Sequence, residues 1–227
     1  MEIPSNHEAT HRALVDKIAR ELKPVRRLWP IPIRLAIWML VDIAVLACLW
    51  TWYMRPDFAA AVRRPQFLLE IGFFFLAGQL LAFIALSAAV PGRETSRAQV
   101  GLCVAVIAGA ILLLAGEPVA AYGSNAEFVR AGVRCMFASL IFATFPLLTL
   151  FWVVRRGAVF EARRTGAMVA GAALLFTFAI QRGGCPLDDR QHLMVWHLLA
   201  PGTILIGISV IAAARWMRLS VSTRPSG

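Results

Sequence analysis

Six apolar runs, each bracketed by charged residues, constrain this chain more than any other feature of its sequence. Each run is close to the roughly 20 residues that a helix needs to cross a bilayer, with the third and fifth on the short side. Of the 227 residues, 59% are hydrophobic and only 16% are charged, which is more apolar surface than a soluble core of this size can bury. We therefore predict an all-α, polytopic membrane protein with a six-transmembrane-helix bundle. The predicted spans are Leu35–Tyr53, Phe67–Val90, Val100–Ala115, Ala131–Val154, Thr165–Ile180 and Leu193–Ala214.

The basic residues predict how this bundle is oriented. An even number of spans puts both termini on one side, and sixteen Lys and Arg residues flank the spans on that side. Seven flank them on the other side, with Arg134 counted at the mouth of the fourth span. Because cytoplasmic segments carry the excess of Lys and Arg, we predict that both termini are cytoplasmic. The chain then divides into a cytoplasmic segment (1–34), a transmembrane domain (35–214) and a cytoplasmic tail (215–227). Such a basic balance favours contact with anionic lipid headgroups over nucleic acid.

The N-terminal segment carries a short amphipathic helix. Its apolar residues lie four apart at Leu14, Ile18 and Leu22, with Val15 beside them. A single helix of this length is marginal in water, so it needs a surface to lie on. Spacing alone leaves two alternatives open, the membrane surface and a groove on a protein partner.

The start of the last span is unusually rich in reactive side chains. It holds one thiol, two carboxylates and two imidazoles: Cys185, Asp188, Asp189, His192 and His197. Pro186 suits the first position of a helix, which predicts Cys185 as the N-cap and both aspartates in the first turn. That position would favour the thiolate of Cys185, although the neighbouring carboxylates oppose it. At helical spacing Asp188, His192 and Trp196 share one face, with His197 on its flank. A structural helix start with ordinary ion pairs is the plainer alternative.

The four cysteines do not form a C-x-x-C pair, which argues against a zinc ribbon or a thioredoxin-type motif. The predicted topology puts Cys135 and Cys185 at the outer face, an oxidising compartment in a Gram-negative host. Cys48 and Cys103 lie within spans, where lone cysteines usually act as small apolar fillers. Whether Cys135 and Cys185 come close enough to bridge is left open by the sequence.

The remaining polar residues argue against catalysis and transport. Asp42 and Glu70 should face the bundle interior, but the spans offer no connected line of ionisable groups and no evident partner for either. The sequence contains no phosphate-binding loop, no nucleophile elbow and no zinc-protease motif, so we predict that the protein is not an enzyme. A membrane thiol redox protein and a small metal transporter remain as alternative functions.

Three stretches resemble a known family. They are Leu14-Val15-x-x-Ile18-Ala19-x-x-Leu22-x-Pro24-Val25-Arg26-Arg27-Leu28, Gly132-x-x-Cys135, and Cys185-Pro186-x-Asp188-Asp189-x-x-His192-x-x-x-Trp196-His197. With six predicted spans, they resemble the negative-regulator-of-sigma-F family of polytopic anti-sigma factors in the bacterial inner membrane. The resemblance implies that the protein sequesters an extracytoplasmic-function sigma factor and releases it when metal or oxidant acts on two outer cysteines.

Carried onto this chain, the resemblance implies Cys135 and Cys185 as the sensing pair. No cofactor is certain, but zinc or another thiophilic metal could bind there, and mixed soft and hard donors are available. The candidate metal ligands are Cys135, Cys185, Asp188, His192 and His197. The partner-binding residues would be the apolar positions of the N-terminal segment, which are Leu14, Val15, Ile18, Leu22 and Val25. The implied partners are the sigma factor and the lipid bilayer, without direct contact to nucleic acid.

Overall fold

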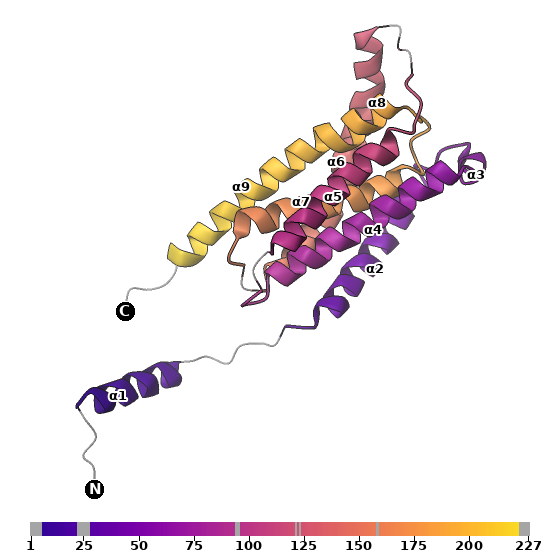
Figure 1. Cartoon of the computed structure of the whole chain (residues 1–227). Helices are drawn as coiled ribbons and strands as arrows, with labels where there is room; N and C mark the ends of the chain where they lie inside the picture. The colour runs from indigo at the N-terminus through magenta and orange to yellow at the C-terminus, as the bar shows by residue number, and fades with distance from the viewer. Residues whose placement is uncertain are drawn as a thin grey trace.

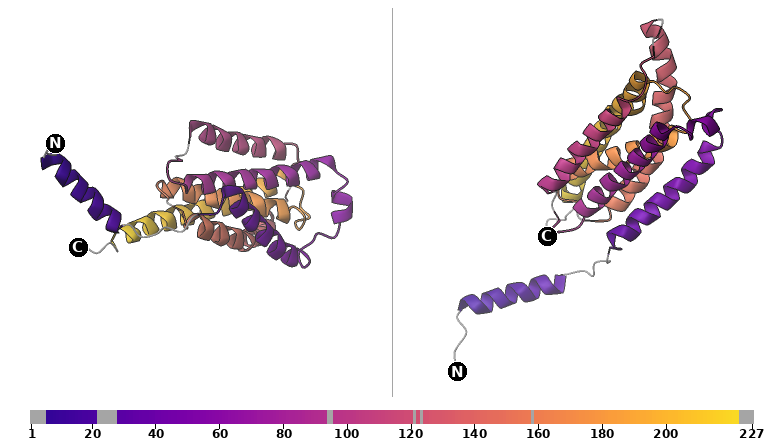
Figure 2. Two further views of the ribbon diagram at one scale, coloured as in Figure 1. Left: turned by 90° about the horizontal axis from the view of Figure 1, so that it is seen from below. Right: turned by 45° about the vertical axis from the view of Figure 1, so that its right-hand side comes forward.

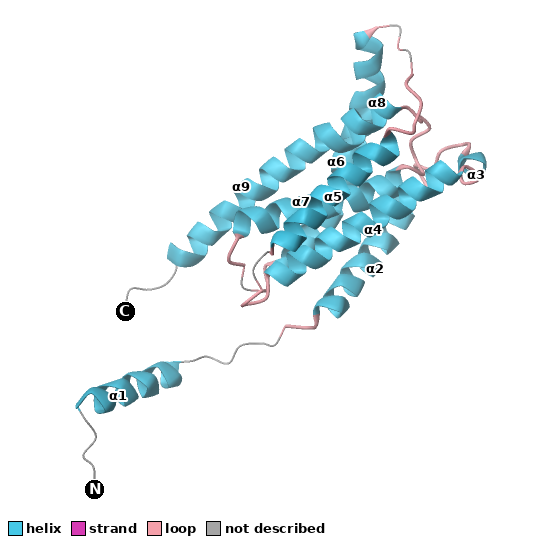
Figure 3. Ribbon diagram, viewed as in Figure 1, coloured by secondary structure: helices cyan, strands magenta, loops and turns pink. Residues whose placement is uncertain are grey.

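A computed structural model of the chain describes residues 6–21, 28–93, 96–120, 122, 124–157 and 159–222. Every regular element in these residues is helical (Figures 1 and 3), which confirms the all-α prediction. The elements are α1 (Asn6–Glu21), α2 (Ile31–Trp50), α3 (Phe58–Ala61), α4 (Pro65–Ala88), α5 (Arg97–Leu114), α6 (Asn125–Val154), α7 (Ala162–Gln181), α8 (Arg190–His192), the π-helix η1 (Leu193–Leu199) and α9 (Ala200–Ser222).

Within the described residues, six helices are long and apolar enough to cross a membrane. Five are single helices, α2, α4, α5, α6 and α7, and the sixth is the continuous run α8–η1–α9. Local sequence explains several of their starts. Pro65 occupies the first turn of α4, where its missing N–H is no loss. A capping box between Ser96 and Gln99 begins α5, and Ser124 accepts a bond from the Glu127 backbone at the start of α6.

Helix α7 lies inside the bundle, packed against α4, α6 and α9, while α5 runs along its edge (Figure 2). Glycines allow the close approaches. A Cβ at Gly78 of α4 would stand 2.8 Å from the Phe176 backbone nitrogen, and one at Gly166 of α7 would stand 2.7 Å from the Ser209 carbonyl oxygen. Small residues at such contacts let helix backbones come together, which suits association in lipid. Larger side chains fill the remaining space, as in the pairing of Phe74 with Phe178 at 4.0 Å between ring centroids.

Two buried polar contacts tie α2 to α6. The Trp38 indole donates to the Pro146 carbonyl oxygen over 3.1 Å. Asp42 is fully buried and accepts a hydrogen bond from the Thr149 hydroxyl over 3.1 Å. The prediction that Asp42 faces the interior is therefore confirmed, and the expectation that it has no partner is wrong. The partner lies 107 residues away in sequence.

Figure 1 shows which elements lie at each end of the bundle. The start of α2 and the end of α9 lie at one end, and α3 and α8 lie at the other.

In α1, the side chains of Leu14 and Val15 are about half exposed. The side chain of Ile18, and the residues Leu22 and Val25 as a whole, lie outside the described part of the chain.

Candidate functional site

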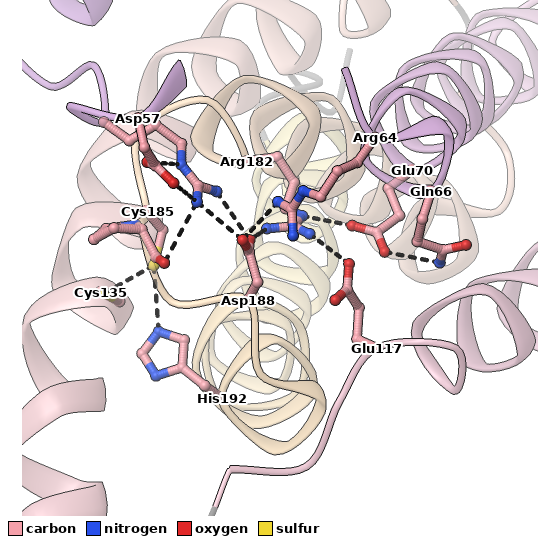
Figure 4. Close-up of polar contacts among 12 residues, drawn as sticks. Asp57, Arg64, Gln66, Glu70, Glu117, Cys135, Arg182, Cys185, Asp188 and His192 are labelled. Carbon is pink, nitrogen blue, oxygen red and sulfur yellow. Dashed lines mark hydrogen bonds and ion pairs between the residues drawn. The ribbon is translucent and has the colours of Figure 1, made fainter. Parts of the chain in front are cut away.

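The structure brings Cys135 and Cys185 together (Figure 4), and the loop that holds Cys185 leads into α8, which lies at the same end of the bundle as α3 (Figure 1). Both are free thiols, and their Sγ atoms are 3.8 Å apart. Cys135 is half-buried in the third turn of α6, one turn after Gly132. Cys185 is 1% exposed, in the loop that joins α7 to α8. The two candidate sensing residues thus come from different elements, helix α6 and the loop between α7 and α8.

A tight backbone turn positions Cys185. The Gly184 and Cys185 N–H groups both donate to the Gln181 carbonyl oxygen, over 2.8 and 2.9 Å, which extends the end of α7. Gly184 has no room for a side chain, because a Cβ there would stand 2.0 Å from the Tyr53 ring. The loop also pairs with the segment after α2, where the Arg55 N–H donates to the Gly183 carbonyl oxygen over 3.0 Å.

The last helix has its N-cap four residues later than the sequence pattern predicts. The N-cap is Asp189, whose carboxylate accepts from the His192 N–H over 2.9 Å, so Cys185 and the aspartates do not occupy the predicted positions. Asp189 also accepts from the Ala120 N–H over 2.8 Å and from the Tyr122 hydroxyl over 2.9 Å. Burial opposes its charge, but these three donors outweigh it and lower the pKa of Asp189. A carboxylate with such donors is a better cap than the thiol of Cys185.

His192 and His197 both lie close to the two thiols. The His192 Nε2 atom lies 3.5 Å from the Cys185 Sγ atom, and His197 Nδ1 lies 3.2 Å from the Gln181 side-chain oxygen. One donor atom from each of four residues can be chosen so that all lie within 4.8 Å of one another: Cys135, Cys185, His192 and His197. Both imidazoles are buried. The structure therefore gathers two thiols and two imidazoles into one compact group of potential metal ligands.

Asp188, the fifth candidate ligand, is held elsewhere. Its carboxylate accepts hydrogen bonds from Arg55 over 2.9 Å, from Arg64 over 2.6 Å and from Arg182 (Figure 4). Burial raises the pKa of Asp188, but the bonds from Arg55 and Arg182 and the other guanidinium contacts outweigh burial, so the pKa is well below its usual value. The structure thus separates Asp188 from the sulfur group and places it among arginines.

An ion-pair network that sequence reasoning missed surrounds this carboxylate. Arg182, 1% exposed, also binds Glu70 over 2.5 Å and Glu117 over 2.8 Å. The expectation that Glu70 lacks a partner is therefore wrong. The predicted topology offered one clue, since Glu70 and Arg182 both sit at the outer ends of their spans. Three guanidinium groups, those of Arg55, Arg64 and Arg182, also lie within 5.2–5.7 Å of the Phe67 ring centroid.

The environment raises the pKa of two further groups at this end of the bundle, Cys185 and Glu117. Contact with the Cys135 thiol and burial raise the pKa of the Cys185 thiol, although His192 and His197 act against them. The predicted drift of Cys185 toward thiolate is therefore wrong, because the residue does not lie at a helix start. Burial and the neighbouring Glu70 carboxylate raise the pKa of Glu117 to about 7 despite its ion pair with Arg182.

Fold and site together define an all-helical membrane protein whose thiol and imidazole cluster lies at one end of the bundle. The chain matches the family model described as negative regulator of sigma F over residues 18–219, and it belongs to that family. The family name implies a negative regulator whose partner is a sigma factor. Comparison with curated proteins yields no match. Comparison with solved structures yields none either.

Proposed function

We propose that the protein is an anti-sigma factor of the bacterial inner membrane that holds an extracytoplasmic-function sigma factor at its cytoplasmic face. Release follows when metal or oxidant acts on Cys135 and Cys185. The observation that carries this proposal is the pairing of the two thiols, 3.8 Å apart, in a member of a sigma-regulator family. The Cys185 loop leads into α8, and α8 lies at the end of the bundle opposite the start of α2 and the end of α9 (Figure 1).

The distribution of charge supports the proposed sidedness. Lys and Arg residues are concentrated on the side that carries the termini, with sixteen there against seven on the other side. Cytoplasmic segments of membrane proteins carry such an excess. The cysteine cluster then faces the periplasm, where metals and oxidants arrive from outside, and α1 lies in the cytoplasm with the sigma factor.

Helix α1 is the proposed binding element for the sigma factor. Leu14 and Val15 are 56% and 51% exposed, so the helix presents apolar side chains that no other element of the described chain covers. Ile18, Leu22 and Val25 extend the same stripe in the sequence. A few apolar side chains in a groove normally carry most of the energy of such a contact.

The thiol pair offers two kinds of signal. A peroxide can oxidise one thiol to a sulfenic acid, and attack by the second thiol then forms a disulfide and releases water. Two thiols lose two electrons and two protons in this sequence, and the peroxide is reduced. Alternatively a thiophilic metal ion binds the sulfurs and displaces their protons, and the candidate further ligands are His192 and His197.

Either event changes how two helices pack at their outer ends. Cys135 belongs to α6, and the Cys185 loop leads through α8 and η1 into α9; both helices pack against α7 and run to the other end of the bundle. A tenfold change in sigma affinity requires about 1.4 kcal/mol of difference between the two states. A disulfide is typically worth about 2–4 kcal/mol, so partial coupling is sufficient.

Capture of the sigma factor by the full-length protein in membranes tests whether α1 binds it. Leu14→Glu should weaken capture at least about 30-fold, the effect of losing a hot-spot contact of about 2 kcal/mol. Ala13→Glu is the matched control, because it adds the same charge to an exposed position about 100° around α1 from Leu14, on the side away from Ile18 and Leu22. Equal capture of the sigma factor by wild type and Leu14→Glu would exclude α1 as the element that binds it.

Release of the sigma factor tests whether Cys135 and Cys185 sense metal or oxidant. The double variant Cys135→Ser/Cys185→Ser should insert and capture normally but fail to release the sigma factor on exposure to Cd²⁺ or peroxide. Cys103→Ser, which removes a half-buried thiol from α5, should respond like wild type. A normal response from the double variant would remove the sensing role.

A further inference from the structure

We propose that Cys135, Cys185, His192 and His197 form a closed, four-coordinate site for a single thiophilic cation of the Zn²⁺ type, which the π-helix η1 completes. This inference deepens the proposed function, since it specifies the ligand of the sensing cluster. It concerns metal binding alone and can be tested without a sigma factor.

The distances between donor atoms match tetrahedral coordination. With Zn–S bonds of about 2.3 Å and Zn–N bonds of about 2.0–2.1 Å, a regular tetrahedron separates two sulfurs by about 3.8 Å and a sulfur from a nitrogen by about 3.5 Å. The observed Cys135–Cys185 Sγ separation is 3.8 Å, and the Cys185 Sγ to His192 Nε2 separation is 3.5 Å. Two of the six edges of a metal-sized tetrahedron therefore match, and all four donor atoms lie within 4.8 Å of one another.

The π-helix explains how two histidines five residues apart reach the same ion. In an α-helix each residue turns the chain by about 100°, so His192 and His197 would point about 140° apart. In η1 (Leu193–Leu199) the helix is wound with i to i+5 hydrogen bonds, which stacks residues five apart on one side. The ring centroids are accordingly 5.3 Å apart. Single π-helical turns within longer helices occur frequently at functional sites.

The orientation of His197 leaves one nitrogen for a metal. Its Nδ1–H donates to the Gln181 side-chain oxygen over 3.2 Å, and the Ser139 hydroxyl donates to the same oxygen over 2.7 Å. His197 Nε2 is buried and has no hydrogen-bond partner in the described structure. Metal-binding histidines are typically held in this way, with one nitrogen donating to a carbonyl-type oxygen and the other free for the ion.

The donor set selects the class of ion. Two thiolates and two neutral imidazoles balance a divalent charge and suit Zn²⁺ or Cd²⁺, whereas Ca²⁺ and Mg²⁺ require oxygen ligands. The nearby carboxylate of Asp188 is occupied by three arginines and is not available as a hard donor. Binding releases the two thiol protons to solvent, so uptake of the ion weakens as pH falls.

Titration of the reduced, full-length protein in detergent with Co²⁺, followed by displacement with Zn²⁺, tests the site. We expect one ion per chain, with a thiolate-to-cobalt absorbance that Zn²⁺ abolishes. His197→Ala should weaken Zn²⁺ binding more than the roughly 10–100-fold that loss of an outer partner costs, and Gln181→Leu should fall within that range. His11→Ala, an exposed histidine of α1, is the matched control and should bind as wild type does.

Two single-residue deletions isolate the role of the π-helix. Each removes the extra residue that η1 accommodates and leaves α9 with the same length. Deletion of Met194 spaces the histidines four apart, which keeps both on one face of an α-helix, so Co²⁺ binding should persist. Deletion of Leu198 keeps the spacing of five in an α-helix, turns His197 away, and should lose binding as His197→Ala does.

Several results would overturn the inference. Wild type that takes up no Co²⁺ or Zn²⁺, or His197→Ala that binds as tightly as wild type, excludes the four-donor site. Equal binding by the two deletion variants excludes the π-helix as its cause, and His197→Ala decides the site if either deletion variant fails to fold. Failure of metal binding would leave the anti-sigma proposal intact with a disulfide as its signal, whereas failure of sigma capture would leave the metal site intact.

Discussion

Replacing Arg182 with Met should release the loop that carries Cys185. Arg182 is 1% exposed and holds three carboxylates from different parts of the chain, those of Glu70, Glu117 and Asp188. Removing one partner of a buried ion pair typically costs about 3–5 kcal/mol, because the remaining charge is left uncompensated. If that free energy is lost from the closed loop, the open population rises roughly 10²–10⁴-fold.

The thiol of Cys185 reports this opening, because it is 1% exposed in the folded protein. The assay is the rate of maleimide labelling in full-length protein whose other three cysteines are replaced by Ser. When opening and closing are fast relative to labelling, the rate follows the open population. Arg182→Met should therefore raise the labelling rate by about 100-fold or more. Adding Glu70→Gln should recover part of the effect, since it removes one uncompensated carboxylate.

Arg164→Met is the matched control for this experiment. Arg164 pairs with Glu161 over 3.0 Å, but its side chain is 63% exposed, and such surface pairs contribute about 0–1 kcal/mol. Its labelling rate should therefore stay within about fivefold of the parent. If Arg182→Met labels no faster than Arg164→Met, the buried network does not hold the Cys185 loop and the reasoning fails.

Two further perturbations follow from the same end of the bundle. The pKa of Glu117 is raised from 4.5 to about 7, so the folded state binds its proton more tightly; its contribution to stability is fully present below pH 4.5 and is lost as the pH rises through about 7. Glu117→Gln should flatten that slope in thermal unfolding measured across this range, and an unchanged slope would assign it to another group. A Cβ at Gly132 would stand 2.0 Å from the Trp196 indole nitrogen, so Gly132→Ala should destabilise by about 1–3 kcal/mol. Gly101→Ala in α5, with open space around it, should be neutral or stabilising by up to about 1 kcal/mol, and equal melting of the two variants would contradict this packing.

Much of the candidate site could be named from sequence, but its geometry could not. The stretch from Cys185 to His197 shows its reactive residues directly, and the topology places Cys135 at the same level. The proline pattern predicts a helix start at Pro186, whereas hydrogen bonds from Ala120 and Tyr122, distant in sequence, favour Asp189 as the N-cap. Asp188 was a reasonable metal ligand by chemistry, yet arginines 124 and 133 residues away in sequence bind it instead.

The sequence by itself determined that the chain is helical and has six membrane-length segments. In lipid every backbone polar group must be satisfied within its own segment, so apolar runs of this length have little choice but to form helices. Only the tertiary structure decided which side chains meet. Contacts such as Cys135 with Cys185 and Glu70 with Arg182 depend on which helices are neighbours and how each is rotated, and packing between helices decides both. The π-helical register that aligns His192 with His197 likewise has no signature in residue spacing, because five residues would separate them in an ordinary α-helix.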